Sequence, residues 1–477
     1  MISIHYNTKD VDAYTVYAIE HFIKKYKIPM EINNSELGDA SIKIEIQSSG
    51  NKKFDLKIQE NEVQDEIQGW VKAKDEKIPI FEKPLPLELD FAKNVLAMFY
   101  SNTNQKYPCI TLNGNFINFS FDIFKEVGYI LAGHLERIWS SNKNEKNMIA
   151  KIPIVDCYEK ILFDCLMLAS AKLNVSLEHK PFWPDGKKFA VCLTHDVDRV
   201  KKTFQYVTHT IKNLKKGKIG LVLAQLSFLL RRENPYWNFD EIMEMEKRLG
   251  VKSTFFFLNE RGKTSLFSPR EWKLYWGRYD IKDEKIVETI KRLDAEGWEI
   301  GIHGSYNSYN NIKRMEEEKR ILEELTGKKI HGVSQHYLNL DTVETWLYHE
   351  KLGLVYDTSV GFVDEIGFRR GTCYPYHPFD PAENRTLSLW ELPITIMDSV
   401  FFSDKRDFWK ESIKVLEKVE KYNGVLLLRW HQRFFNENEF PGMSSIYEKI
   451  IKICKEKDAW ITNAYNIVEW LTMRERL

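Results

Sequence analysis

The C-terminal part of the chain, residues 187–477, is predicted to be an α/β domain that folds as a distorted β/α barrel. Short apolar runs have the length of buried strands and cover residues 189–193, 251–258, 298–302, 353–355, 388–392 and 424–429. Helical patterns separate them, for example at residues 239–249, 283–296 and 313–325. Strands that alternate with helices form a parallel sheet with crossover helices. Six or more such units in this stretch are typical of a β/α barrel, here distorted or incomplete.

Residues 1–180 are predicted to form a separate N-terminal region, because two prolines and a glycine between residues 181 and 187 mark a linker. Residues 1–85 combine β-like runs at 2–5, 41–47 and 54–59 with a helical pattern around 14–26, which indicates a small α/β unit. Residues 88–180 are predicted to be mostly helical, with helical faces that include Phe91, Val95 and Leu96, and further helices at 120–140 and 157–173. A β-hairpin is expected at residues 110–119, turning at Asn113 and Gly114.

The composition is that of an ordinary globular protein, with 43% apolar and 29% charged residues. Lysine plus arginine number 69, as do aspartate plus glutamate, so nothing suggests a nucleic-acid partner. The six cysteines show no CxxC pair, which favours reduced, buried thiols. The first residues lack the pattern of a signal peptide, and we therefore expect a cytoplasmic protein.

A basic insertion at about residues 200–235 interrupts the strand–helix rhythm of the C-terminal domain. Its segment 200–232 surrounds an apolar stretch with lysines and arginines. Such an amphipathic segment could make a peripheral contact with an anionic membrane or cover a site. The alternative is a surface helical hairpin with solvated lysines.

Polar residues follow three of the predicted strands, where the active sites of parallel α/β folds lie. Asp196 and Asp198 follow the first strand, and two carboxylates this close are tolerated if a cation lies between them or one takes a proton. An N-cap or an ion pair with Arg199 is the alternative. His303 follows another strand, and carboxylate with imidazole suits Zn²⁺ or a similar divalent ion. His431 ends a third strand and could act as a general acid.

These segments resemble, in order and spacing, the successive motifs of the polysaccharide deacetylases, that is, carbohydrate esterase family four and its relatives. The resemblance covers residues 187–475 and rests on segments 194–198, 253–257, 303–307 and 428–431. It implies a distorted β/α barrel that hydrolyses an N-acetyl or related acyl group on an amino sugar or glycan precursor. The N-terminal region is more weakly similar to an uncharacterised domain that precedes such catalytic domains.

By this resemblance, Asp196 is the catalytic base, Asp198 and His303 are metal ligands, and His431 is the catalytic acid. The bound ion would be divalent, with Zn²⁺ as the first choice. Backbone N–H groups near Tyr337 could then hold the oxyanion.

The chain departs from the family pattern at two positions. Asn307 stands where the motif has its second histidine. Its amide oxygen could bind the metal, although it is a weak ligand for zinc. His336 or His195 could replace it instead, but strand alternation would turn His195 away from Asp196. Ser334 stands where an arginine usually orients the base. Arg369 or Arg370 could supply the guanidinium from another loop, or both could be exposed.

Aromatic residues are dense near the motifs, and Trp430, Tyr306 and Trp390 are the candidates for contacts with a sugar. Core packing is the alternative for most of them. Two further functions stay open: a glycan-binding protein on a degenerate deacetylase fold, and a hydrolase of small non-sugar amides.

Overall fold

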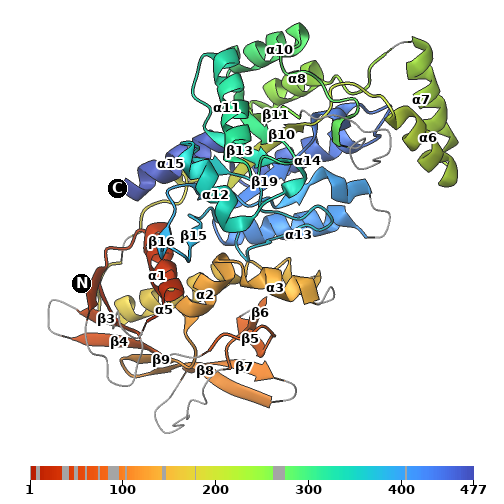
Figure 1. The fold of residues 1–477 in the computed structure, drawn as a ribbon. Coiled ribbons are helices and arrows are strands. Elements are labelled where there is room, and N and C mark those ends of the chain that lie inside the picture. The colour runs from red at the N-terminus through yellow and green to blue at the C-terminus, as the bar shows by residue number, and fades with distance from the viewer. Residues whose placement is uncertain are drawn as a thin grey trace. The chain divides into compact units, whose positions relative to one another are not determined.

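The computed structural model divides the chain into two compact units (Figure 1). Unit 1 comprises residues 1–182 and 367–386, and unit 2 comprises residues 183–366 and 387–477. A segment from within the C-terminal half, residues 367–386, thus belongs to unit 1. The structure describes residues 2–6, 11–34, 42–47, 52–59, 62–73, 76–83, 96–102, 105–141, 147–177, 179–231, 233–260, 274–402 and 406–476.

Unit 1 is built on a nine-stranded mixed sheet in the order β2-β1-β3-β4-β9-β8-β7-β5-β6. Alternating burial along β1 and β3 shows that one face of this sheet is packed and the other is more open. The strands are β1 (Ile2–Tyr6), β2 (Glu31–Asn34), β3 (Ile42–Gln47), β4 (Lys53–Ile58), β5 (Gly69–Ala73), β6 (Glu76–Ile80), β7 (Leu96–Asn102), β8 (Gln105–Asn113) and β9 (Phe116–Phe119). The helices α1 (Ala13–Tyr26), α2 (Ile123–Leu131), α3 (His134–Ser141) and α5 (Ile154–Lys172) lie on one side of it (Figure 1).

The prediction of a mostly helical stretch from residue 88 is wrong for its first part. Residues 96–102 form β7, which pairs antiparallel with β8 from Leu96 opposite Leu112 onward. The apolar spacing that suggested a helix also fits a strand, and pairing with the neighbouring hairpin decides between them. Phe91 and Val95 lie outside the described residues. The predicted hairpin at 110–119 and the predicted helices at 120–140 and 157–173 are confirmed by the pairing of β8 with β9 and by α2, α3 and α5.

Unit 2 contains an eight-stranded parallel sheet in the order β17-β14-β13-β12-β11-β10-β19-β18, with β20 also paired to β10. Its strands are β10 (Ala190–Val197), β11 (Thr254–Leu258), β12 (Glu299–Gly304), β13 (Gly332–Gln335), β14 (Tyr356–Asp357), β17 (Trp390–Glu391), β18 (Ile396–Met397), β19 (Val425–Arg429) and β20 (Trp460–Thr462). Its edge strands β17 and β18 do not pair with each other in the described part of the chain. The predicted distorted β/α barrel is thereby confirmed.

The strands of unit 2 are apolar because helices cover the outside of the sheet. Every residue of β10, β11 and β19 is buried. The helices are α8 (Phe239–Leu249), α10 (Glu284–Ala295), α11 (Ile312–Thr326), α12 (Thr342–Lys351), α13 (Phe408–Lys421), α14 (Met443–Glu456) and α15 (Ala464–Arg476). Gly250 ends α8 in the left-handed conformation that glycine favours.

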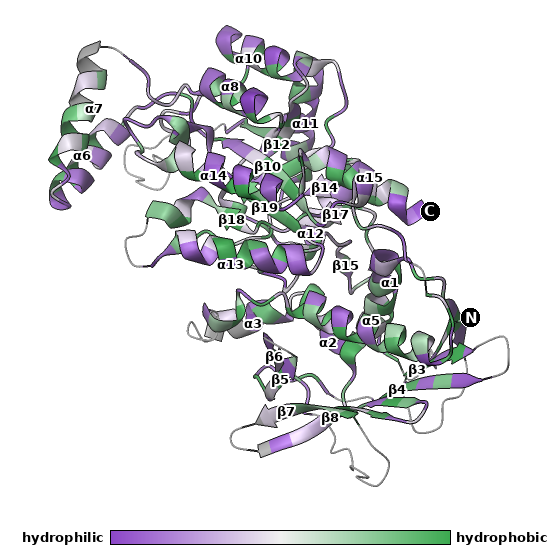
Figure 2. Cartoon of the chain, turned by 180° about the vertical axis from the view of Figure 1, so that it is seen from behind, coloured by the Kyte–Doolittle hydropathy of each residue, from purple (hydrophilic) through white to green (hydrophobic). Residues whose placement is uncertain are grey.

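The insertion forms a helical hairpin of α6 (Gln205–Lys215) and α7 (Ile219–Arg231). The two helices contact each other and stand away from the body of the barrel (Figures 1 and 2). Among the described residues, no helix is long and apolar enough to cross a membrane.

Candidate active site

The candidate site lies at the carboxyl ends of the parallel strands of unit 2. Asp196 and Asp198 come from the end of β10, His303 from β12, His336 from the residue after β13, and His431 from just beyond β19. Because parallel strands end at one edge of their sheet, these side chains converge from separate parts of the sequence.

Asp198, His303 and His336 place one ligand atom each within 4.8 Å of the others, and all three are buried. His303 Nε2 lies 3.1 Å and His336 Nε2 lies 3.7 Å from Asp198 Oδ1. One carboxylate and two imidazoles match the donor set of catalytic zinc sites, which keep a further position open. The three residues therefore fit a divalent ion.

The outer nitrogen of each imidazole has its own partner, as in metal sites whose histidines are oriented by a second layer of residues. His303 Nδ1 lies 2.7 Å from the carbonyl oxygen of Ser334, so Nε2 faces the other ligands. His336 Nδ1 lies 3.4 Å from Glu260 Oε2. Burial, the largest cause, lowers the pKa of His336 to about 4, so this imidazole is neutral and able to bind a metal near neutral pH.

Two guanidinium groups also contact the ligand group. Arg433 Nη1 donates to Asp198 Oδ2 at 2.6 Å, and Arg278 Nη2 lies 3.2 Å from His336 Nε2. Burial opposes ionisation of Asp198, but the nearby cations, Arg433 first among them, hold its pKa well below the usual value. Asp198 is thus an anion with one oxygen facing the histidines and the other facing Arg433.

Asp196 lies beside this group and has different partners. Its Oδ2 is 3.7 Å from His303 Nε2 and 3.5 Å from Arg429 Nε, and Ser334 Oγ lies 3.4 Å from its Oδ1. Burial raises its pKa, and the stronger opposing effect of Arg429 and the histidines leaves the pKa below normal. Asp196 is therefore ionised near neutral pH and can accept a proton.

His431 forms a pair with Asp398 at the end of β18. Its Nδ1 lies 2.8 Å from Asp398 Oδ2, and the same carboxylate accepts a hydrogen bond from the backbone N–H of His431. This fixes the ring so that Nε2 points into the site, 3.5 Å from Asp198 Oδ2. The carboxylate on the outer nitrogen holds the imidazole so that Nε2 is free to exchange a proton with a group bound in the site.

Two of the proposed replacement ligands lie elsewhere. Asn307 is exposed, and its amide donates to the hydroxyl of Tyr275 at 3.5 Å, so it is not in the ligand group. His195 is fully buried and lies between the carbonyl of Trp430 and the carboxylate of Glu246. Strand alternation turns it away from Asp196, as expected. His336 is the histidine that lies with Asp198 and His303.

The prediction that Arg369 or Arg370 orients the catalytic base is wrong, because both side chains pair with Glu136 of unit 1 instead. Arg369 forms two hydrogen bonds with Glu136, at 2.8 and 3.0 Å, and Arg370 is buried near the same carboxylate. Both belong to unit 1, because residues 367–386 fold with that unit. The guanidinium beside Asp196 comes from Arg429, which is held by the carbonyl and the hydroxyl of Thr358.

The aromatic candidates divide into core and rim. Trp430 is completely buried, with its ring 5.6 Å from that of Tyr447, and the buried indole of Trp390 donates to Thr472. Their prediction as sugar contacts is wrong, because both side chains fill the core. Tyr306 is half-buried, and its ring lies 5.8 Å from the exposed ring of Tyr337. Tyr337 has a left-handed backbone with φ 62° directly after His336.

Five residues of the site were missed by sequence reasoning: Arg278, Asp398, Arg429, Glu260 and Arg433. Arg429 had a usable signal: it pairs with Thr194 across two parallel strands, so alternation places it on the face of Asp196, two residues on. Asp398 follows β18, a strand too short to stand out as an apolar run. Glu260 and Arg433 lie beyond β11 and β19 and had no signal of their own.

A cavity of about 580 Å³ adjoins the site and extends toward the helical hairpin. Asp198, Arg278, Tyr337 and Arg433 line it at the site. Its other walls include residues of α6 and a group of aromatic side chains, Phe401, Phe402, Phe434 and Phe440. The cavity has room for a ligand of several rings and presents cations to it.

No family model matches the chain, and no curated protein matches it in sequence. Solved structures similar to it include one described as a polysaccharide deacetylase from Mycobacterium smegmatis, 19% identical, with TM-score 0.40 over 61% of this chain and 93% of that one. Another is PuuE allantoinase, 15% identical, with TM-score 0.39 over 61% and 92%. A third is described as a polysaccharide deacetylase from Pseudomonas aeruginosa PAO1, 16% identical, with TM-score 0.40 over 61% and 92%.

Proposed function

We propose that unit 2 is a metal-dependent hydrolase that removes an N-acetyl or related acyl group from an amino sugar or a glycan precursor. The observation that supports this most is the convergence of three parts on one strand edge: an ionised carboxylate, an Asp/His/His ligand group and a histidine–carboxylate pair. These are the parts that amide hydrolysis with a bound metal needs.

The ligand group would consist of Asp198, His303 and His336. A divalent ion there, with Zn²⁺ as the first choice, would supply Lewis acidity to the acyl carbonyl and to the attacking water. Glu260 and the carbonyl of Ser334 hold the two histidine rings in the orientation this requires.

Asp196 would take the proton from the attacking water as the new C–O bond forms. His431 would give a proton to the amide nitrogen as the C–N bond breaks, releasing a carboxylate and an amine. Asp398 would stabilise the protonated ring of His431, and Arg429 would hold Asp196 in its ionised form. The N–H groups around Tyr337 are the proposed donors to the oxyanion.

The test is release of acetate from a panel of N-acetylated sugars by the full chain supplied with Zn²⁺ or Co²⁺. We expect turnover of at least one member and loss of turnover in Asp196→Asn. Absence of release across the panel, with the Asn variant indistinguishable from wild type, would contradict the proposal.

A second function, binding of an anionic glycan without metal or turnover, is favoured by one observation. Arg433 at 2.6 Å from Asp198 and Arg278 at 3.2 Å from His336 place positive charge where a cation would bind. Elemental analysis of purified protein separates the two functions. One equivalent of metal, lost in both Asp198→Ala and His303→Ala, supports the hydrolase, and sugar binding with no metal in wild type supports the alternative.

A further inference from the structure

The segment that contains the α6–α7 hairpin has an unusual charge distribution. Residues 200–232 include six lysines and two arginines but no aspartate or glutamate. The chain as a whole has equal numbers of acidic and basic residues. The positive charge is therefore concentrated on one projecting element of a protein that is otherwise balanced.

The same hairpin exposes large aliphatic side chains in regular positions. On α6, Val207, Ile211 and Leu214 are 62%, 49% and 56% exposed. Their spacing of four and three residues places them on one stripe of the helix. On α7, Ile219 and Leu223 are 64% and 62% exposed, again one turn apart. Isolated exposed aliphatics are common, but here a stripe of three on α6 and a pair on α7 stand exposed on one basic hairpin.

The opposite face of α6 lines the cavity beside the candidate site. Thr208, Lys212 and Lys216 line the cavity that leads to the candidate site. By helical geometry this face lies across the helix from the aliphatic stripe. The stripe therefore points away from the cavity, and covering it would leave the cavity unobstructed.

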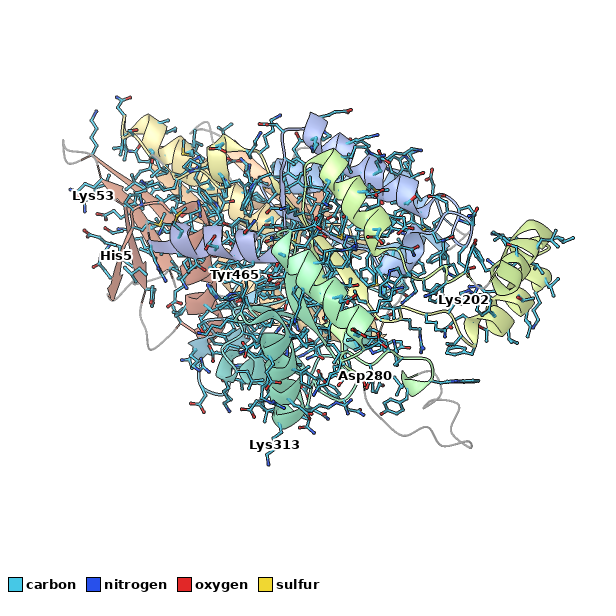
Figure 3. The ribbon with its side chains drawn as sticks, turned by 90° about the horizontal axis from the view of Figure 1, so that it is seen from above. His5, Lys53, Lys202, Asp280, Lys313 and Tyr465 are labelled. Carbon is cyan, nitrogen blue, oxygen red and sulfur yellow. The ribbon has the colours of Figure 1, made fainter. Side chains whose placement is uncertain are left out.

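The base of the hairpin is held firmly to the barrel. Lys202, labelled in Figure 3 where the hairpin leaves the barrel, is buried and donates to both oxygens of Glu439 at 2.6 and 2.7 Å. His209 on α6 lies 3.2 Å from the same carboxylate. Because both contacts anchor α6, its aliphatic stripe has a defined orientation relative to the site.

We propose that the outer face of the α6–α7 hairpin docks on the surface of an anionic lipid bilayer. The helices have 11 and 13 residues, too short to span a bilayer but sufficient to lie in its interface. The aliphatic stripe would enter the boundary between headgroups and acyl chains. Exposed Lys215 on the flank of α6 could contact acidic headgroups, and the lysines of the polar face would add longer-range attraction to the anionic surface. Lys202 takes no part, because it is paired with Glu439. Charge complementarity and the absence of any acidic residue in the segment favour this partner over a second copy of the chain.

Docking in this manner would hold the cavity about one helix diameter, roughly 10 Å, from the lipid surface. A substrate whose sugar is attached to a lipid would then reach the site from the bilayer. This consequence rests on the proposed hydrolase, whereas the docking itself does not.

The test is co-sedimentation of the full chain with vesicles of phosphatidylcholine containing about one third phosphatidylglycerol. We expect binding at low salt, release at 1 M salt and little binding to pure phosphatidylcholine. The variant Val207→Ser/Ile211→Ser/Leu214→Ser should lose at least about tenfold in vesicle partition. Circular dichroism checks that its helices persist.

A matched control changes three aliphatics of similar exposure elsewhere: Leu168→Ser, Val363→Ser and Met473→Ser, which are 42%, 52% and 46% exposed in wild type. This control should bind vesicles as wild type does. The proposal is overturned if wild type does not sediment, if it binds neutral vesicles equally well, or if both triple variants behave alike. A wild-type dimer that the hairpin variant converts to a monomer, without vesicle binding, would assign the stripe to self-association instead.

Acetate release from a soluble N-acetylated sugar distinguishes this proposal from the proposed function. The hairpin variant should retain that activity while losing vesicle binding. Vesicle binding without turnover would support the docking surface and contradict the proposed hydrolase.

Discussion

Both units bury groups of carboxyl side chains, but the two groups are in opposite states. In unit 2, Asp196 and Asp198 have lowered pKa values, because arginines and histidines outweigh the effect of burial. In unit 1, Asp122 and Glu126 are buried near Glu82, and burial raises their pKa to about 7 and about 8. Burial alone favours the neutral acid, and in unit 2 the nearby cations outweigh it and keep Asp196 and Asp198 charged.

The partners of these carboxyls explain the different roles. In unit 1, Asp122 accepts from the backbone N–H groups of Phe124 and Lys125, and Glu126 accepts from those of Phe81 and Glu82. These bonds cap a helix and join it to the end of the sheet. The carboxylates of unit 2 instead face histidines and a cavity, which is where perturbed groups indicate chemistry.

The largest effect is expected for Asp196→Asn. An amide cannot accept the proton of the attacking water, so kcat should fall by about 10²–10⁴-fold. Asp198 and the histidines are unchanged, so the metal content should stay at the wild-type level. Steady-state kinetics with elemental analysis checks both, and an active Asn variant would show that another group is the base.

The ligand group should respond differently from the base. Metal binding should weaken by about tenfold or more in each of Asp198→Ala, His303→Ala and His336→Ala, because each variant removes one proposed metal ligand. Asn307→Ala is the matched control and should bind metal normally, since that side chain is exposed. Metal titration decides between them. If Asn307→Ala lost the metal and His336→Ala kept it, Asn307 rather than His336 would be the third metal ligand.

A smaller effect is expected for Asp398→Asn, because Asp398 positions His431 and does not meet the substrate. We expect kcat to fall by about 10–100-fold with KM nearly unchanged, since the ring of His431 would lose the carboxylate that orients it. Equal effects on kcat and KM would indicate a purely structural residue.

Asp398 and His431 illustrate which residues of the candidate site could be predicted from the sequence and which could not. His303, His431 and the pair Asp196 and Asp198 end apolar runs that were long enough to recognise as strands. Asp398 ends a two-residue strand, which leaves no pattern in the sequence. Strand order was not available either, and it is the adjacency of β19 and β10 that brings Arg429 to Asp196.

The assignment of residues 367–386 to unit 1 could not be predicted from the sequence either. Residues 367–386 lie within the sequence of the barrel, so Arg369 seemed available to the site. Arg369 pairs with Glu136 and belongs to unit 1, and no local sequence pattern shows that this segment leaves the barrel. In unit 1, the helical pattern assigned near residue 96 failed because strand pairing with β8 overrides local spacing.

The smallest effect is expected for Glu126→Gln in unit 1, which tests the other half of the comparison. Burial raises the pKa of Glu126 from its ordinary value of 4.5 to about 8. A carboxyl with a raised folded-state pKa stabilises the fold below its unfolded pKa, and this contribution is lost as pH rises through the folded value. Wild-type unit 1 should therefore lose stability as the pH rises from about 4.5 to about 8.

Glutamine keeps the acceptor for the N–H groups of Phe81 and Glu82 but does not ionise. The variant should show less of that decline, by on the order of 1 kcal/mol, because Asp122 and Glu82 still titrate. Thermal unfolding followed at several pH values provides the measurement. A decline as steep as in wild type would mean that Glu126 is already ionised when folded, and that the carboxyls of the two units do not differ in the way described.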